Sequence, residues 1–233
     1  MSQAGYICRL FCRIAPRYDR MNRIMSFGQD LKWRRLTARW VVSGGEQVLD
    51  VGTGTGDLAL ALAQEVGPTG EVVGVDFCSH MLDLAQQKVQ GSTLNTRCRF
   101  FEGDAMQLPF PNESFDVVTM GFTLRNLPDY SQALQEAHRV LRPGGKIAVL
   151  DLGRPPLLPL RLLYYLAFFL VAPLVGVFNR GNVSAYFYLP RSLMSYPPQD
   201  QLASLLQAAG FLGVEYKNLS GGIVCVHRGF KAR

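Results

Sequence analysis

The sequence predicts an α/β fold with a mainly parallel, seven-stranded sheet that ends in an antiparallel hairpin. Two observations support this prediction. Short apolar runs alternate with helical patterns from residue 47 to residue 150, and such alternation is typical of a parallel sheet with helices on both faces. Near the carboxyl end, two further runs are separated by little more than Ser220-Gly221-Gly222, and so short a link joins antiparallel strands.

The predicted elements follow one another in the order that such a fold requires. The parallel strands are expected at residues 47–51, 71–76, 98–101, 115–120 and 146–150, and the hairpin strands at 214–217 and 223–227. The helices are expected at residues 57–66, 79–90, 131–141 and 199–209. Apolar side chains recur at helical spacing in the second of these helices, and the run Pro143-Gly144-Gly145 ends the third.

Composition indicates a folded chain with a basic amino-terminal end. The 233 residues are 48% hydrophobic and 18% charged, which is too apolar for a disordered protein and sufficient for one large core. Residues 1–40 hold nine lysines and arginines but only two acids. Such a basic segment suits an anionic surface, either lipid headgroups or nucleic acid, and a solvated helix face explains it equally well.

The five cysteines do not have the spacing of a metal site. Cys8 and Cys12 lie one helical turn apart without a histidine or another cysteine nearby, so both are interpreted as packing residues and no metal is expected. This usage fits a reducing cytoplasm. Arginines interrupt every apolar stretch before Val41, so no signal peptide is expected. Residues 1–17 resemble a short transit peptide, but a first helix of the domain is preferred.

The most informative segment is the run Gly52-Thr53-Gly54-Thr55-Gly56, which follows the first predicted strand. Glycine is needed where the backbone approaches a ligand closely. Asp76 ends the second predicted strand twenty residues later. Its carboxylate is placed to accept hydrogen bonds from ribose hydroxyls, and capping of the next helix is the alternative role. These residues predict a nucleoside-containing cofactor.

The spacing of the glycines indicates which cofactor this is. The pattern is Gly-x-Gly-x-Gly, whereas Gly-x-Gly-x-x-Gly packs a helix against a diphosphate. S-adenosylmethionine (SAM) has no diphosphate, and its carboxylate suits the amino terminus of the following helix. A parallel sheet that closes with an antiparallel hairpin is also the layout of class I, Rossmann-like, SAM-dependent methyltransferases. We therefore predict SAM as the cofactor, and a nicotinamide oxidoreductase is disfavoured.

Further positions are expected around the same cofactor. Asp104 and Ala105 follow the third strand. In methyltransferases an acid there meets the adenine amino group, and a small neighbour leaves room for the ring. Gly121 ends the fourth strand and opens space beside the methionine part of SAM. The predicted cofactor-binding residues are Gly52, Gly54, Thr55, Asp76, Asp104, Ala105 and Gly121.

The domain organisation follows from these segments. Residues 1–45 are expected to form a basic helical cap and residues 46–233 the SAM-binding domain, with an apolar insertion at about 154–198. Within the insertion, Leu162–Phe178 is seventeen residues long, carries no charge and contains Pro173. This run is slightly short for a membrane span. A lid or interfacial segment that contacts an apolar substrate or a membrane is preferred to a buried core helix.

Several motifs outside the glycine run resemble one known family. They are Tyr18-Asp19-x-Met21-Asn22-x-x-Met25-Ser26, Phe122-x-Leu124-Arg125-Asn126, Arg139–Gly145 and Asn218–Val224. These motifs are similar to signatures of the C-methyltransferases of ubiquinone and menaquinone biosynthesis, and the resemblance extends from Tyr18 to Lys231. Asp30 departs from the pattern, because the family usually has histidine there.

The resemblance implies an enzyme that methylates a carbon of a polyprenylated quinol, with demethylmenaquinol as the expected substrate and a polyprenyl benzoquinol as the alternative. Within the matching motifs, Arg125 is expected to be catalytic, because a fixed cation stabilises the oxyanion of a deprotonated quinol. Asn126 is a candidate for orienting the hydroxyl, Tyr18 and Asn22 for closing the site, and His227 for a base acting through water. A salt bridge or a satisfied core polar group is the alternative role for each.

The predicted partners follow from that activity. They are the quinol, a membrane surface and a further copy of the chain in a homo-oligomer, and the expected location is the cytoplasm, peripheral to the inner face of the membrane. No nucleic acid is expected, because no series of base-stacking aromatic residues accompanies the amino-terminal arginines. A nucleic-acid-associated SAM-binding module is the alternative function outside the enzymes.

Overall fold

The structure is a computed structural model that describes residues 3–166, 169 and 192–233. Its strands are β1 (Gln47–Val51), β2 (Glu71–Asp76), β3 (Cys98–Glu102), β4 (Phe115–Gly121), β5 (Leu141–Leu152), β6 (Leu212–Leu219) and β7 (Val224–Phe230). Its helices are α1 (Gln3–Met25), α2 (Gln29–Val41), α3 (Asp57–Glu65), α4 (Ser79–Val89), α5 (Tyr130–Val140) and α8 (Gln199–Ala208), and another helix spans residues 158–166.

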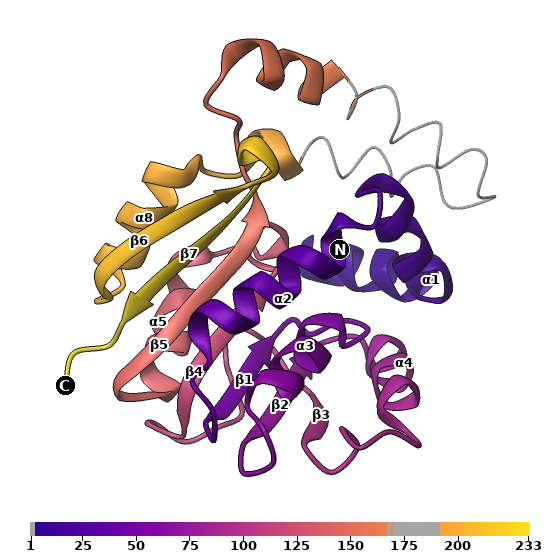
Figure 1. Cartoon of the computed structure of the whole chain (residues 1–233), viewed down its shortest axis with the longest axis vertical. Coiled ribbons are helices and arrows are strands. Elements are labelled where there is room, and N and C mark those ends of the chain that lie inside the picture. The colour runs from indigo at the N-terminus through magenta and orange to yellow at the C-terminus, as the bar shows by residue number, and fades with distance from the viewer. Residues whose placement is uncertain (1–2, 167–168, 170–191) are drawn as a thin grey trace.

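The seven strands form one sheet in the order β3-β2-β1-β4-β5-β7-β6. Neighbouring strands from β3 across to β5 are parallel, whereas β7 is antiparallel to both β5 and β6. Figure 1 shows this sheet with helices packed on both sides of it. The predicted α/β fold with an antiparallel terminal hairpin is confirmed.

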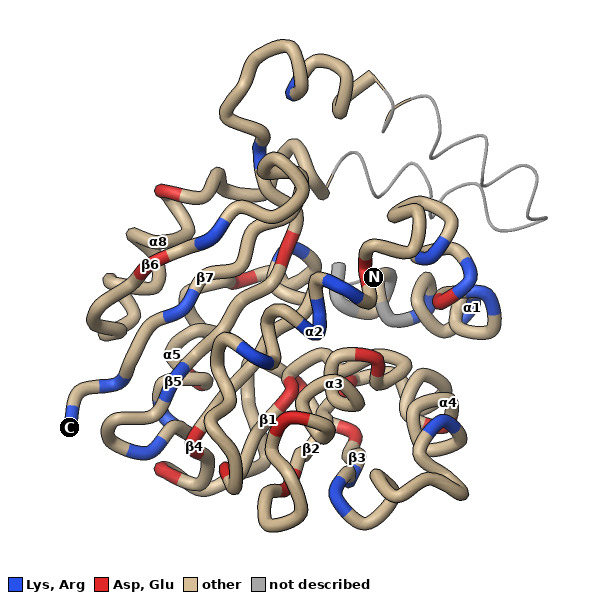
Figure 2. Tube along the Cα trace, viewed as in Figure 1, with Lys and Arg blue, Asp and Glu red and all other residues tan. Residues whose placement is uncertain are grey.

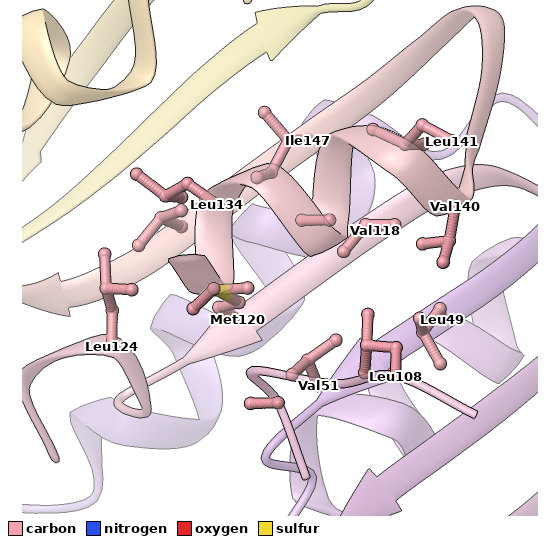
Figure 3. Packing of buried hydrophobic residues seen from close by; sticks show 14 of the residues in the cluster. Leu49, Val51, Leu108, Val118, Met120, Leu124, Leu134, Val140, Leu141 and Ile147 are labelled. Atoms are coloured by element: carbon pink, nitrogen blue, oxygen red, sulfur yellow. The ribbon is translucent and has the colours of Figure 1, made fainter. Parts of the chain in front are cut away.

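The two faces of the sheet bury different side chains, because successive residues of a strand point in opposite directions. Val48 and Val117 are fully buried in a cluster with residues of α2 and α3. Their neighbours Leu49 and Val118 are fully buried in a larger cluster with α5 and α8, part of which is shown in Figure 3. Burial on both faces fixes the carboxyl ends of β1, β2 and β4, and the candidate site lies at those ends.

β5 is longer than the sequence predicts. It begins at Leu141 and not at Lys146, because Leu141 pairs with Phe115 before the register shifts and Lys146 pairs with Val117. Such an irregularity absorbs extra residues in one strand. The run Pro143-Gly144-Gly145, expected only to end a helix, therefore continues within the strand.

α1 is a 23-residue helix that contains Pro16. It packs on α4 and, in Figure 1, lies beyond the carboxyl ends of the central strands. Figure 2 marks its basic residues in blue along the backbone trace. The division into a cap of residues 1–45 and a cofactor domain of residues 46–233 stays a prediction. Most of the expected insertion at 154–198, including residues 167–168 and 170–178 of the run Leu162–Phe178, lies outside the described residues.

The interpretation of Cys12 as a packing residue is wrong. Cys12 of α1 forms a disulfide with Cys78, which precedes α4, across a separation of 66 residues. Sequence spacing gave no sign of this pair, because the fold brings the two cysteines together. Cys98 and Cys225 are buried free thiols, as expected for packing residues.

His227 on β7 fixes the end of α8 to the sheet. Its side chain is buried, and Nε2 lies 2.9 Å from the backbone oxygen of Gln199, the first residue of α8. Burial lowers the pKa of His227 to about 4, although the hydrogen bond opposes this change. The imidazole is therefore neutral in the folded protein at pH 7.

We predict that His227 makes the fold acid-sensitive. The folded pKa lies below the ordinary value of 6.5, so between pH 6.5 and 4 the unfolded chain takes up a proton that the folded chain does not. As the pH is lowered through that window, protonation of this histidine in the unfolded chain should reduce the free energy of unfolding by about 1.4 kcal/mol per pH unit. The free energy of unfolding, measured with urea at several pH values, should change less steeply with pH in His227→Gln than in the unchanged protein. His80→Gln, at an exposed position, is the control, and equal slopes in all three proteins would contradict the prediction.

Candidate active site

The glycine loop between β1 and α3 has an open side. Gly54 has a φ of +55°, and a Cβ built on it would meet no atom within 4 Å. Gly52 is glycine for a different reason, since a Cβ there would lie 2.2 Å from the side chain of Thr123. The left-handed conformation and the open space at Gly54 leave its backbone accessible to a ligand.

A buried carboxylate supports this loop from below. Asp50 of β1 accepts hydrogen bonds from the hydroxyls of Thr53 and Thr119, at 2.8 and 2.7 Å. Burial raises the pKa of Asp50 to about 6, although both hydrogen bonds lower it. The hydroxyls thus satisfy a polar group inside the sheet and hold the start of the loop against β4.

Asp76 joins two turns at the carboxyl end of β2. One carboxylate oxygen accepts the N–H of Gly54 at 2.8 Å, and the other accepts the N–H of Cys78 at 3.0 Å. The second contact is a turn ahead of α4, and it does not cap the helix, because Cys78 precedes the first helical residue and α4 has no side-chain cap. Burial raises the pKa of Asp76 despite these hydrogen bonds. A carboxylate in so little water forms strong hydrogen bonds with any hydroxyl that reaches it.

A cavity lies between the glycine loop and α1. Five of the predicted cofactor-binding residues line it, namely Gly52, Gly54, Asp76, Ala105 and Gly121. Apolar residues that the sequence did not single out complete its wall, among them Phe77, Met81 and Leu127. Bare backbone, a buried carboxylate and an apolar wall fit the methionine, ribose and adenine parts of SAM respectively. We refer to this space as the cofactor cavity.

Thr55 and Asp104 do not line the cofactor cavity. The hydroxyl of Thr55 donates to Asp19 of α1 at 2.5 Å. Asp104 is exposed, and its carboxylate accepts the N–H of Met106 at 2.8 Å within its own turn. Their backbone neighbours reach the cavity instead, and Gly103 is one of them. A role for either side chain in cofactor binding stays a prediction.

α1 closes the cofactor cavity from above. Phe11 and Tyr18 project from α1 into its lining, and the enclosed volume is only about 50 Å³. Ligand pockets usually measure ~300–1,000 Å³, so α1 must shift when a cofactor enters. Besides the contact with Thr55, Asp19 pairs with Lys88 of α4 at 2.6 Å. Arg23 of α1 pairs with Asp57 of α3 at 2.7 Å.

A second and larger cavity adjoins the first. Its volume is about 400 Å³, and Tyr18 and Phe122 line both cavities. Most of its other lining residues are apolar and come from the α1–α2 turn, α2 and the helix at 158–166, among them Ile24, Met25, Phe27, Trp33, Leu160 and Leu163. We refer to this space as the apolar cavity. It suits a largely apolar molecule that lies next to the cofactor.

Arg125 lies in the wall of the apolar cavity, on the 3-10 helix Leu124–Asn126. Its guanidinium forms a buried ion pair with Asp151 of β5 and lies over the ring of Phe122, 5.5 Å from the centroid. Nε is buried without a hydrogen-bond partner among the described residues. Burial alone would lower the pKa of Arg125, but Asp151, together with Tyr18 and Tyr196, outweighs that effect and raises it. A permanent cation thus lies in the wall of the cavity.

Asp30, where the family usually has histidine, also lies in the lining of the apolar cavity. It is buried, forms ion pairs with Arg23 and Arg34, and accepts the hydroxyl of Ser26 at 2.9 Å. The carboxylate therefore orders the turn between α1 and α2. No described contact requires it to take part in a reaction.

Two of the other polar candidates line the cavities, and the third does not. Asn22 lines the apolar cavity, and Asn126 lines the cofactor cavity while its amide donates to the backbone oxygen of Phe122 at 3.0 Å. His227 lies outside both cavities, against Gln199. The structure therefore gives no support to His227 as a base. Among the described residues, no cluster of three or more acids, histidines or cysteines could hold a metal ion.

Two lining residues were missed by sequence reasoning. Arg34 of α2 is buried and lines the apolar cavity beside Arg125. Phe122 has a φ of +59°, which is uncommon for a bulky residue. The spacing of Asp30 and Arg34, one helical turn apart, was the available signal for a buried ion pair. No local pattern signals the conformation of Phe122.

The described residues include no helix that is both long and apolar enough to span a membrane. Exposed apolar side chains are instead frequent on the segments that contribute lining residues to the apolar cavity. They come from the α1–α2 turn and from residues 157–166, and are Ile24, Phe27, Leu157, Leu158, Leu162, Leu163 and Leu166. Phe27 is 92% exposed. An exposed apolar patch of this kind usually marks a contact surface.

Comparison with known proteins agrees with this geometry. Demethylmenaquinone methyltransferase of Geobacillus kaustophilus is 44% identical over 231 residues, which cover 99% of this chain and 98% of the relative. The protein of the same name from Thermus thermophilus is 44% identical over 221 residues, covering 94% and 99%. A solved SAM-dependent methyltransferase from Thermotoga maritima has the same fold, with a TM-score of 0.69, 21% identity and coverage of 96% and 98%.

The family assignment extends over almost the whole chain. Residues 1–231 match the sequence pattern of the ubiE/COQ5 methyltransferase family. The fold, the loop at 52–56 and the carboxylate of Asp76 are those expected for a SAM site. The protein is a SAM-dependent methyltransferase, and it belongs to the ubiE/COQ5 methyltransferase family.

Proposed function

We propose that this enzyme methylates a ring carbon of a polyprenylated demethylmenaquinol, as the names of its relatives suggest. One observation carries the proposal. An apolar cavity of about 400 Å³ adjoins the cofactor cavity and has a buried guanidinium, Arg125, in its wall. A quinol requires both features, because its ring and tail are apolar and its hydroxyl must ionise next to a cation.

The residues of the site divide the work of methyl transfer. When bound, SAM supplies a methyl group on a sulfonium, and Gly52, Gly54, Asp76 and Ala105 are the residues that would hold it. Arg125 stabilises the oxyanion of the quinol, which places electron density on the neighbouring ring carbon. Tyr18 and Phe122, which line both cavities, exclude water and orient the ring. The hydroxyl proton leaves for solvent before the transfer. With SAM bound, the ring carbon would gain the methyl group as the sulfur–methyl bond breaks and would then lose its own proton to water, and the oxyanion would take one proton back.

The exposed apolar side chains on the segments that line the apolar cavity explain how a lipid-soluble substrate enters. Phe27 on the α1–α2 turn and Leu162 on the helix at 158–166 are two of them, and both segments also contribute lining residues. A prenyl tail that leaves the cavity would pass between these segments. This arrangement supports peripheral binding of the enzyme to a bilayer, with the cavity open towards the lipid.

Methyl transfer to a quinol tests the proposed function directly. Purified enzyme with methyl-labelled SAM should place label in a short-chain demethylmenaquinol held in its reduced form, and the product should carry the methyl group on carbon. The oxidised quinone is the control, and it should not react because it has no hydroxyl to ionise. The rate of label transfer to a benzoquinol with the same prenyl chain tests the alternative substrate. Label in neither quinol would refute the proposal.

Arg125→Ala should reduce turnover by about 100-fold or more, because the oxyanion loses its cation. The affinity for SAM, measured by calorimetry, should change by less than about threefold, since Arg125 is outside the lining of the cofactor cavity. Arg125→Lys retains a charge opposite Asp151 and should recover part of the activity.

Asp76→Asn is the matched comparison, and it should show the opposite pattern. The affinity for SAM should fall by about tenfold or more, because the variant loses a charged acceptor for ribose. Equal losses of SAM affinity and turnover in Arg125→Ala would remove the role proposed for Arg125.

Phe27→Ser should weaken binding to phosphatidylglycerol vesicles by about tenfold, the loss expected when one large apolar side chain no longer enters lipid. Co-sedimentation measures the effect. Leu212→Ser is the control, because Leu212 is 58% exposed on β6 and is outside the lining of the apolar cavity. Equal binding by all three proteins would contradict the proposed membrane surface.

A further inference from the structure

Phe122 lies between two arginines in the wall of the apolar cavity. The Cζ atom of Arg34 is 5.1 Å from the centroid of the Phe122 ring, and that of Arg125 is 5.5 Å from it. All three residues line the cavity. The cavity therefore has two cations beside one aromatic ring, although the sequence motifs pointed to Arg125 alone.

The backbone of Phe122 is held so that this arrangement persists. Its φ of +59° costs energy for a bulky side chain. Two hydrogen bonds maintain it, since the N–H of Phe122 donates to Leu150 at 2.7 Å and its oxygen accepts from Asn126 at 3.0 Å. Strain retained in this way at a cavity wall fixes the ring against both guanidiniums.

The lining of the apolar cavity contains two guanidiniums and one carboxylate, and further carboxylates lie behind it, Asp57 on Arg23 and Asp151 on Arg125. The charged lining residues are Asp30, Arg34 and Arg125. Asp30 is shared, because it also pairs with Arg23, whereas Asp151 behind the wall serves Arg125. A lining with more cation than anion suits a substrate that becomes an anion as it reacts.

Arg34 has hydrogen-bonding capacity that the described structure does not use. Its Nη1 donates to the backbone oxygen and to the carboxylate of Asp30, at 3.1 and 3.0 Å. Within the part of the chain that the structure describes, no other hydrogen bond leaves its guanidinium. Burial lowers the pKa of Arg34, so the cation is poorly solvated and an added acceptor would stabilise it.

We propose that Arg34 is a second substrate-binding residue, which donates to the quinol oxygen on the side of the ring opposite the oxygen held by Arg125. The proposal rests on the proposed function, because it concerns the same substrate. A dihydroxy ring lying along Phe122 presents one oxygen to each guanidinium. Recognition at two points then selects a substrate with an oxygen at both positions and fixes which ring carbon faces the cofactor.

A substrate that lacks one contact tests this role. The acceptors are a short-chain demethylmenaquinol and its deoxy analogue, a naphthol that lacks the hydroxyl farther from the reacting carbon. The unchanged enzyme should prefer the diol over the naphthol in kcat/KM by about tenfold or more, because the naphthol offers no oxygen to the N–H groups of Arg34 that are not bonded to Asp30. In Arg34→Gln this preference should fall to about twofold or less.

Controls separate substrate binding from a structural role. Arg39→Gln changes an exposed arginine of the same helix, paired with Glu65 at the surface, and should keep the full preference for the diol. SAM affinity and thermal unfolding are measured for each variant. If Arg34→Gln is unfolded, Arg34→Lys replaces it, and its shorter reach should also reduce the preference.

The outcomes distinguish this inference from the proposed function. A folded Arg34 variant that keeps the full preference for the diol overturns the role of Arg34 and leaves the quinol methyltransferase activity standing. An unchanged enzyme that accepts both substrates equally also overturns it. An unchanged enzyme that methylates neither acceptor overturns the proposed function itself, and the role of Arg34 with it.

Discussion

The two hydrogen bonds accepted by Asp76 determine the geometry on which the rest of the site depends. Its carboxylate receives the N–H of Gly54 from the loop after β1 and the N–H of Cys78 from the turn before α4. One side chain thus joins the ends of two neighbouring strands and remains in the lining of the cofactor cavity. Because both strands are buried on both faces, the carboxylate cannot move without disturbing the core.

The two cavities assign different physical tasks to adjoining regions. The cofactor cavity offers backbone and one buried acid, whereas the apolar cavity offers hydrocarbon surface and buried guanidiniums. Phe122 and Tyr18 form the boundary between them. Each region would serve poorly alone, because an adenosyl group needs polar partners and a quinol tail needs none. Methyl transfer depends on their contact at this boundary.

The sequence was sufficient for the sheet, because strand and helix patterns and the loop at 52–56 are local. It also identified Gly54 and Asp76, whose positions follow from the ends of parallel strands. It could not reveal that Thr55 is bonded to Asp19, or that Cys12 meets Cys78, since these contacts join α1 to segments more than thirty residues away. Arg34 was missed for a related reason. Its importance comes from lying beside Phe122, which is distant in the chain.

The position of α1 has a kinetic consequence. The helix is fastened above the cofactor cavity through the disulfide of Cys12, the carboxylate of Asp19 and the guanidinium of Arg23. Spent cofactor must leave by the route that these contacts close. Exchange therefore requires the contacts of Asp19 and Arg23 to open together while the disulfide keeps the helix attached, and the rate of that opening sets an upper limit on turnover whatever the speed of the chemical step.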